Sequence, residues 1–245
     1  MTINRRALLG LGTAAAVTAL TTFSRGAPAL AQSGGYKLIR HGHVLTLDPT
    51  LGEIPDGDVL ILDDEIVDVG SQLSLPGGQG TIIEADGMVV APGLIDNHRH
   101  MWGTLLRGFS GDHTFGDYFG QVLLTISPLL TTDDVYLGCL LGAYEALNTG
   151  VTTVLDWNHG TNTREHALSA VTALRDSGIR AVFGYSSPAA DSVRHDAPPT
   201  VADLDAVQSV VQTDPLVSLA IATRNPAQAD AQGLQRIADD ITQAR

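Results

Sequence analysis

One short segment constrains this chain more than any other, because it brings two histidines to the end of an apolar run. Residues 89–100 read VVAPGLIDNHRH and end in His98 and His100. Side chains alternate between the two faces of a strand, so both imidazoles are predicted to point to one side and Arg99 to the other. Neutral imidazole is a common ligand of zinc and also suits iron. The segment predicts a metal site that begins on a strand; two hydrogen-bonded histidines at a strand end are the alternative.

After Pro92 the chain alternates short apolar runs with helical patterns. The runs that predict strands buried on both faces are Leu94 to His98, Thr152 to Asp156, Arg180 to Tyr185 and Val217 to Ala222. Helices are predicted between them, one capped by Thr132 and one by a capping box of Asn162 and Glu165. This alternation predicts a parallel sheet built from strand–helix units.

Residues 36–90 differ, because short β-rich runs are broken there by Gly, Pro and Asp. These runs are Lys37 to Arg40, His43 to Leu47, Asp58 to Leu62, Glu65 to Val69 and Thr81 to Glu84. They predict a small β-domain, with a tight hairpin at Asp63 and Asp64. A second His-x-His pair, His41 and His43, is expected to be structural, since nothing before it resembles the strand that leads to His98.

The first 31 residues are predicted to be a signal peptide. Arg5 and Arg6 precede an uncharged run rich in Ala, Gly, Thr and Leu, and Ala29-Leu30-Ala31 offers a small-residue cleavage site. Paired arginines are typical of a twin-arginine leader. An uncleaved membrane anchor is the alternative, but the run is weakly apolar and shorter than the roughly 20 residues that a spanning helix needs. We expect an exported protein, periplasmic or extracellular, with no stable membrane anchor.

The charge and the cysteine content exclude some classes of protein. The chain has 27 acidic and 14 basic residues, for a formal net charge of −13, and no basic cluster that could bind a phosphate backbone. No nucleic-acid partner is therefore expected. Cys139 is the only cysteine, so no intrachain disulfide can form. It lies in a helical pattern from Asp133 to Thr149 and is predicted to be a small buried side chain rather than a catalytic thiol.

Several segments together resemble a known family. They are residues 92–100 (PGLIDNHRH), residues 105–108 (LLRG) and residues 146–156 (ALNTGVTTVLD). They are similar to the metal-dependent amidohydrolase superfamily, in its aminohydrolase branch of cytosine deaminase, the methylthioadenosine and S-adenosylhomocysteine deaminases and the triazine hydrolases. The resemblance runs from about Tyr36 to Arg245. It implies an α/β fold, a (β/α)8 barrel preceded by a small β-domain, with His98 and His100 as ligands of a divalent metal, zinc or iron.

The resemblance also implies a function. Members of this family hydrolyse carbon–nitrogen bonds other than peptide bonds, and the similar branch suggests deamination of a cyclic, nucleobase-like or triazine-like small molecule. In such enzymes the metal activates a water molecule while carboxylate and imidazole groups transfer protons.

The length predicts an incomplete barrel. A (β/α)8 barrel takes about 250 residues, whereas residues 91–245 yield only about four strand–helix units. The family's two further histidines, its general acid/base and its metal-binding Asp are expected beyond Arg245. We therefore expect an amino-terminal half that is inactive alone. The alternative is a truncated, non-catalytic protein that binds a metal or small ligand, or that assembles with another copy of itself or with a missing half-barrel.

Active sites of such barrels lie at the carboxyl ends of the strands, so residues just beyond each strand are candidates for contact with the substrate. These candidates are His159, Trp102, His113 and Asp156, and His195 lies beyond the third predicted strand. For His159 a loop histidine with only local hydrogen bonds is the alternative, and for Trp102 it is ordinary packing.

Asp96 shares the strand parity of His98 and His100. Its carboxylate is predicted either to accept a hydrogen bond from a ligand imidazole, and so fix its tautomer, or to cap nearby backbone amides. Arg99, on the opposite face, is expected to make a structural contact.

Overall fold

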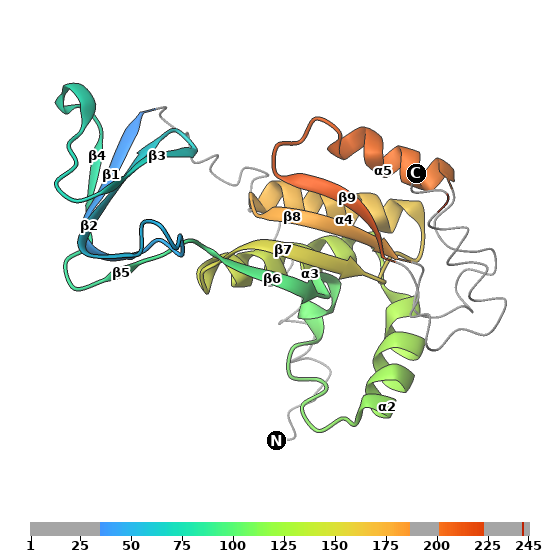
Figure 1. Cartoon of the computed structure of the whole chain (residues 1–245). Helices are drawn as coiled ribbons and strands as arrows, with labels where there is room; N and C mark the ends of the chain where they lie inside the picture. Colours follow the sequence, from blue (N-terminus) through green and yellow to red (C-terminus); the bar gives the residue numbers. More distant parts are fainter. Residues whose placement is uncertain (1–34, 187–200, 223–241, 243–245) are drawn as a thin grey trace, which may run out of the picture. The chain divides into compact units, whose positions relative to one another are not determined.

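The computed structural model describes residues 35–186, 201–222 and 242 (Figure 1). The chain divides into two compact units, Met1–Pro92 and Gly93–Arg245. The predicted signal peptide, residues 1–31, lies outside the described residues.

The described part of the first unit forms a five-stranded sheet. Its strands are β1 (Tyr36–Leu45), β2 (Glu53–Leu62), β3 (Glu65–Gly70), β4 (Thr81–Glu84) and β5 (Val89–Val90). They follow the order β3-β2-β1-β4, and β5 also pairs with β1. β2 is antiparallel to β1 and β3, whereas β4 and β5 run parallel to β1. A 3₁₀ turn, Pro76–Gly78, lies between β3 and β4.

The sequence predicted two strands where the structure has the single strand β1. The predicted break between Arg40 and His43 is an irregularity inside the strand, because the register against β2 shifts on both sides of Gly42. His41 has a φ of 61°, a left-handed conformation that residues with a side chain rarely adopt. An irregularity of this kind interrupts the alternation of side chains but does not end the backbone pairing with β2. The sequence pattern therefore reads as two runs, although the strand is continuous.

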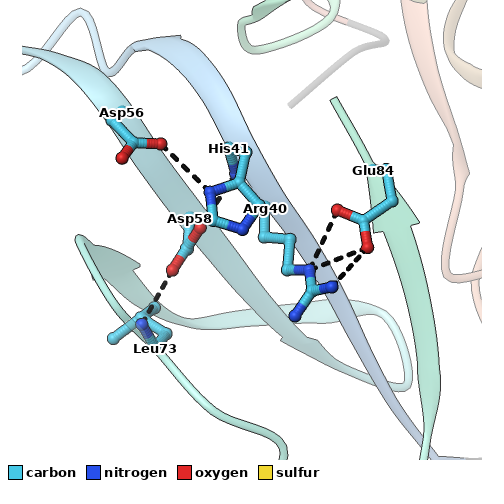
Figure 2. Close-up of polar contacts among 6 residues, drawn as sticks. All are labelled: Arg40, His41, Asp56, Asp58, Leu73 and Glu84. Atoms are coloured by element: carbon cyan, nitrogen blue, oxygen red, sulfur yellow. Dashed lines mark hydrogen bonds and ion pairs between the residues drawn. The ribbon is translucent and has the colours of Figure 1, made fainter. Parts of the chain in front are cut away.

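A buried carboxylate holds this irregular part of β1 in place (Figure 2). Asp58, on β2, is 4% exposed, and it accepts the backbone N–H of His41 at 3.1 Å and that of Leu73 at 2.7 Å. The same figure shows the imidazole of His41 beside Asp56, with Nδ1 3.2 Å from Oδ1. Asp58 therefore ties the strand to the loop that follows β3.

Two further polar side chains of β1, those of Arg40 and His43, contact carboxylates at the surface of this unit. The Arg40 guanidinium contacts both carboxylate oxygens of Glu84, with Nε 2.9 Å from each (Figure 2). His43 Nε2 lies 3.1 Å from Glu53 Oε2. Each histidine of the second His-x-His pair thus has a carboxylate beside it.

Asp63 and Asp64 connect β2 with β3 in a tight hairpin, which confirms the predicted connection. Leu62 pairs with Glu65 across it. Asp63 has a φ of 56°, and two-residue hairpin loops favour such left-handed residues because they match the twist of the strands. The Asp63 carboxylate also accepts the backbone N–H of Gly35 at 2.8 Å.

The second unit is an α/β structure, as the alternating pattern predicted. Its described strands are β6 (Leu94–Arg99), β7 (Val151–Asn158), β8 (Arg180–Ser186) and β9 (Val217–Ala222). They lie in the order β6-β7-β8-β9, and each neighbouring pair is parallel. The connecting helices are α3 (Thr132–Asn148), α4 (Arg164–Ser177) and α5 (Val201–Val211). Figure 1 shows these helices packed along the sheet.

A longer connection joins β6 to α3. It consists of a 3₁₀ segment (Met101–Leu106), the short helix α2 (Phe115–Asp117), a π-helical segment (Tyr118–Ile126) and a 3₁₀ turn (Ser127–Leu129). Figure 1 draws the last three as one green helix labelled α2. Among the described helices, none has both the length and the apolar character that crossing a bilayer requires.

Both predicted helix caps are wrong by one residue. The cap of α3 is Thr131, whose side chain accepts the N–H of Asp134 while the Asp134 carboxylate accepts the N–H of Thr131. This reciprocal pair requires an acidic or amide residue three positions on, which Thr132 lacks. α4 begins after Thr163, and the side chain of Asn162 instead donates to the backbone oxygen of Ser127 at 2.8 Å.

The core of the second unit fixes the segment that follows β6. Met101 and Trp102 are almost fully buried in the same cluster as residues of α3, among them Val135, Cys139 and Ala143. The contact is close enough to require glycine on α3. A Cβ on Gly138 would lie 2.4 Å from the backbone oxygen of Trp102, well inside van der Waals contact. The chain leaving β6 is therefore held against α3 by packing.

The substitution Asp58→Asn is expected to destabilise the first unit by about 1–3 kcal/mol, because one of the two backbone amides loses its acceptor. Amide hydrogen exchange at His41 and Leu73 should become faster. Asp68→Asn, a change at an exposed residue of the neighbouring strand β3, is the matched control and should leave both rates unchanged. Unchanged exchange in Asp58→Asn would contradict the role of this carboxylate.

Candidate metal centre

Two neighbouring parallel strands end at the same edge of the second sheet, and each is followed by a histidine. His98 lies in β6 and His100 directly after it, while His159 directly follows β7. β6 and β7 pair in parallel, with Arg99 opposite Asp156. The carboxyl ends of the two strands are therefore adjacent, and the three imidazoles meet there. We call His98, His100 and His159 the imidazole cluster.

The rings of the imidazole cluster are in contact. The His98 and His100 rings lie 4.9 Å apart, centroid to centroid, in an edge-to-face arrangement. The convergence of these two side chains agrees with the alternation predicted for a strand. The ring of His159 stacks on that of His100, with centroids 4.3 Å apart and 25° between the planes.

His100 makes a hydrogen bond that fixes its tautomer. Its Nδ1 lies 2.6 Å from the backbone oxygen of Trp157, the penultimate residue of β7. A carbonyl oxygen only accepts, so Nδ1 carries the proton and Nε2 keeps its lone pair. Burial lowers the pKa of His100 below its ordinary value, and the neighbouring His98 lowers it further, while the bond to Trp157 acts in the opposite direction. The neutral ring offers one nitrogen to a metal.

His159 is held differently. The Trp102 indole Nε1 lies 3.0 Å from His159 Nδ1, and the two rings meet edge to face. Burial, together with the proximity of His100 and His98, lowers the pKa of His159 to about 3. The ring is therefore neutral at physiological pH.

Asp156, predicted to contact the substrate, is instead fully buried. One carboxylate oxygen accepts the backbone N–H of Met101 at 2.9 Å, and the other accepts the side-chain amide of Asn158 at 3.0 Å. The Asn158 side chain also accepts the N–H of Gly160. Asp156 thus joins the residue after His100 to the turn that carries His159, so it positions the imidazole cluster from within the core.

Cys139 lies against this network, where its Sγ is 3.4 Å from the Asn158 amide nitrogen. Burial raises the pKa of the thiol well above its ordinary value, with the nearby Asp156 as a second cause. The thiol stays protonated and apolar in character, as predicted for a buried side chain.

Asp96 does not contact an imidazole within the described residues. Its carboxylate accepts the backbone N–H of His98 at 3.2 Å and lies 3.5 Å from the guanidinium of Arg99. This is the capping alternative. The register against β7 is irregular between Asp96 and Arg99, so simple alternation fails at this point. Arg99 also pairs with Glu145 of α3 at 3.0 Å, which is the expected structural contact.

The other predicted substrate contacts, Trp102, His113 and His195, differ in their surroundings. Trp102 is 1% exposed, so its ring packs in the core and reaches the cluster only through its N–H. His113 is half-buried beside Phe109, with ring centroids 5.3 Å apart, and its Nδ1 is buried without a hydrogen-bond partner in the described structure. His195 lies outside the described residues.

Within residues 35–186, 201–222 and 242, no group of three or more His, Cys, Asp or Glu side chains has the arrangement that would hold a metal ion. Sequence reasoning considered Trp102 only for substrate contact or packing, and it missed two contributors to the site. These are the backbone oxygen of Trp157 and the indole N–H of Trp102, each of which contacts a residue 57 positions away. The one signal in the sequence was the position of two tryptophans beside the histidines, Trp102 two residues after His100 and Trp157 two residues before His159.

The family of the chain follows from its sequence. Residues 89–244 match the profile described as "Amidohydrolase family", which covers the second unit almost completely. The chain belongs to the amidohydrolase family, which confirms the resemblance carried by the segment around His98.

Curated relatives include two kinds of deaminase. The chain is 33% identical over 148 residues to a 5'-deoxyadenosine deaminase of Methanosarcina mazei, an alignment that covers 60% of this chain and 32% of the relative. It is 34% identical over 154 residues to a 5-methylthioadenosine/S-adenosylhomocysteine deaminase of Desulforudis audaxviator, covering 62% and 35%. The chain thus spans about a third of the length of these curated relatives.

Solved structures with a similar fold include a triazine hydrolase and an adenosine deaminase. A triazine hydrolase from Arthobacter aurescens superposes with a TM-score of 0.68 at 23% identity, covering 84% of this chain and 50% of that chain. An adenosine deaminase from Xanthomonas campestris with bound zinc gives 0.60 at 22% identity, covering 85% and 47%. At these identities the likeness establishes the α/β fold alone.

The buried Asp156 predicts a pH dependence of stability. Burial raises its pKa from 3.8 to about 6, so the folded chain holds this proton more tightly than the unfolded chain does. The resulting contribution to the free energy of unfolding is complete below pH 3.8 and is lost as the pH rises through about 6. Between about pH 4 and about pH 7, the stability of the wild type should therefore fall relative to that of Asp156→Asn.

Urea unfolding followed by tryptophan fluorescence measures this difference, since Trp102 and Trp157 both lie in the second unit. Asp112→Asn, at an exposed loop residue, is the control and should follow the wild type at every pH. Parallel pH profiles of the wild type and Asp156→Asn would show that the carboxyl group is not perturbed.

Proposed function

We propose that this chain is the amino-terminal part of a metal-dependent hydrolase that acts on carbon–nitrogen bonds other than peptide bonds, most specifically a deaminase of a cyclic, nucleobase-like or triazine-like small molecule. The observation that carries the proposal is the convergence of His98 and His100 at the carboxyl end of β6. Family membership and the deaminases among the relatives support the type of reaction.

The donor set fits a divalent metal, zinc or iron. His100 presents the lone pair of Nε2, because its Nδ1–H is engaged by Trp157, and the ring of His98 lies beside it. A backbone carbonyl that orients a histidine in this way is a common feature of metal sites. A bound metal would supply a Lewis acid that activates water for attack at an aminated ring carbon.

Two imidazoles are fewer than the three protein ligands that a catalytic zinc usually has. We therefore place the remaining ligands and the general acid/base beyond Arg245, and we propose an incomplete barrel that is inactive alone. The chain's own contribution is to orient two ligands and to shield one side of the site through the buried Trp102 and Asp156.

A second candidate function is favoured by the exposure of apolar residues on β6. Leu94 and Ile95 are 62% and 72% exposed. Their strand, β6, lies at the edge of the described sheet. Exposed apolar residues on an edge strand favour association. The second candidate is a non-catalytic protein that binds a metal or a small ligand, or that assembles with a second copy or a separate half-barrel. It would associate through this edge.

Metal binding tests the site directly. Zinc titration followed by metal analysis of the desalted chain should give weak or substoichiometric binding by the wild type and at least about tenfold weaker binding by His98→Ala and by His100→Ala. His113→Ala is the matched control, because this histidine lies outside the imidazole cluster. Tight one-to-one binding would show that the missing ligands are present after all, and equal binding by all variants would remove the metal site.

Ammonia release tests the reaction. If the reading frame continues past Arg245, its product should release ammonia from 5'-deoxyadenosine, 5'-methylthioadenosine or a triazine, and the 245-residue chain alone should not. Loss of turnover in His98→Ala would link the reaction to this site. Turnover by the chain alone would refute the incomplete barrel, and a native stop codon after Arg245 would favour the second candidate.

We further propose that the mature protein is exported after removal of residues 1–31. The sequence around Arg5 and Arg6 supports this proposal. Replacing both residues with lysine should retain the precursor in the cytoplasm, as followed by fractionation and immunoblotting. Normal export of this variant would exclude the twin-arginine route.

A further inference from the structure

The contact between Trp102 and His159 determines which ring nitrogen of His159 carries the proton. The indole Nε1 of Trp102 lies 3.0 Å from His159 Nδ1. An indole nitrogen can donate a hydrogen bond but cannot accept one. His159 Nδ1 must therefore keep its lone pair, and the proton of the neutral imidazole resides on Nε2.

His100 has the opposite tautomer. Its Nδ1–H donates to the backbone oxygen of Trp157, so its lone pair is on Nε2. The rings of His100 and His159 are stacked 4.3 Å apart. Two adjacent imidazoles thus differ in function, since His100 offers a lone pair and His159 offers an N–H.

Packing prevents the indole from leaving His159. Trp102 is 1% exposed, and a Cβ added at Gly160 would lie 2.8 Å from Trp102 Cγ. Only glycine at position 160 leaves room for the ring in this orientation. On the other side, Gly138 of α3 lies directly against the backbone of Trp102. The hydrogen bond is therefore made by a side chain with little freedom to move.

These contacts exclude His159 as a metal ligand, although it lies within the imidazole cluster. An imidazole binds a metal through a nitrogen lone pair. The lone pair on Nδ1 is already used by Trp102, and Nε2 carries the proton. Moving that proton to Nδ1 would set two N–H groups against each other and leave the buried indole N–H without an acceptor.

We propose that His159 is a hydrogen-bond donor to the substrate through Nε2–H, and that Trp102 is the positioning residue that maintains this tautomer. Within the described residues, the only hydrogen bond to the His159 ring is the one from Trp102. Nε2–H is thus available beside His100. The ligand class is a heteroaromatic ring with a lone-pair acceptor, a ring nitrogen or a carbonyl oxygen. The inference rests on the proposed function and specifies how that site recognises its substrate.

Long-range proton–nitrogen NMR correlations of the ¹⁵N-histidine-labelled, metal-free chain test the tautomers. His159 should show an unprotonated Nδ1 and a protonated Nε2, and His100 should show the reverse pattern. The two spin systems are identified by their loss in His159→Gln and His100→Gln. A protonated Nδ1 in His159 would overturn the proposal even if the proposed function is correct.

Two variants separate the hydrogen bond from packing. Trp102→Phe retains an aromatic ring but removes the donor, and Gly160→Ala retains the indole but displaces it. In each, the His159 nitrogen signals should move towards a mixture of tautomers. Trp157→Phe, which changes the other tryptophan and leaves its backbone oxygen in place, is the matched control and should leave His159 unchanged. An unchanged His159 in both variants, with the fold confirmed by the amide spectrum, would refute the positioning role of Trp102.

Zinc titration of the same labelled chain tests the exclusion of His159 from the metal. Added Zn²⁺ should shift the Nε2 signal of His100 and leave His159 Nδ1 in its hydrogen-bonded state. Coordination by His159 would overturn the inference. If Zn²⁺ perturbs neither residue while the tautomers are as expected, the failure lies with the metal site of the proposed function and leaves the tautomer assignment intact.

The donor role has its own readout in the product of the full reading frame. His159→Phe should raise KM for 5'-deoxyadenosine about tenfold, the loss of one hydrogen bond, and His159→Gln, which keeps an N–H, should restore most of it. An equal KM in His159→Phe and the wild type would refute donation to the substrate.

Discussion

The parallel pairing of β6 with β7 is the constraint on which the candidate site depends. Parallel strands end at one edge of a sheet, so His100 after β6 and His159 after β7 become neighbours without any further feature of the chain. Asp156 then fixes their relative position, because its carboxylate accepts the backbone N–H of Met101 and the side-chain amide of Asn158, which itself accepts the N–H of Gly160. The imidazole cluster is thus a product of backbone pairing that a single buried side chain makes rigid.

The sequence predicted those parts of the structure that depend on local periodicity. The limits of β9 agree with the predicted run, Val217–Ala222, a short and mainly apolar segment that is followed by Thr223 and Arg224. The rings of His98 and His100 converge as predicted, although the pairing of β6 with β7 is irregular between Asp96 and Arg99. Irregularities that interrupt the alternation of side chains along a strand were not predicted. The irregularity at His41 depends on a left-handed residue that Asp58 stabilises from the next strand, and no pattern within β1 records that contact.

Partners distant in the chain account for most of what sequence reasoning missed at the site. Trp102 and His159 are 57 residues apart, and each alone has an ordinary alternative, packing for the indole and a loop for the imidazole. Only the distance between their nitrogens gives the two residues a joint role. Asp156 was predicted to end its strand, but β7 continues to Asn158. Its burial depends on α3 and on the segment after β6, which a pattern along one strand does not describe.

The order of the strands in the second sheet has a consequence for how the protein is made. Each parallel pair joins strands that are consecutive along the chain, from β6 through β9. Among the described strands, each finds its partner in the next strand along the chain, so this part of the sheet can be extended one unit at a time as the chain emerges from the ribosome. The turns that bear His100 and His159 come together as soon as β7 has been synthesised, early in translation of the second unit.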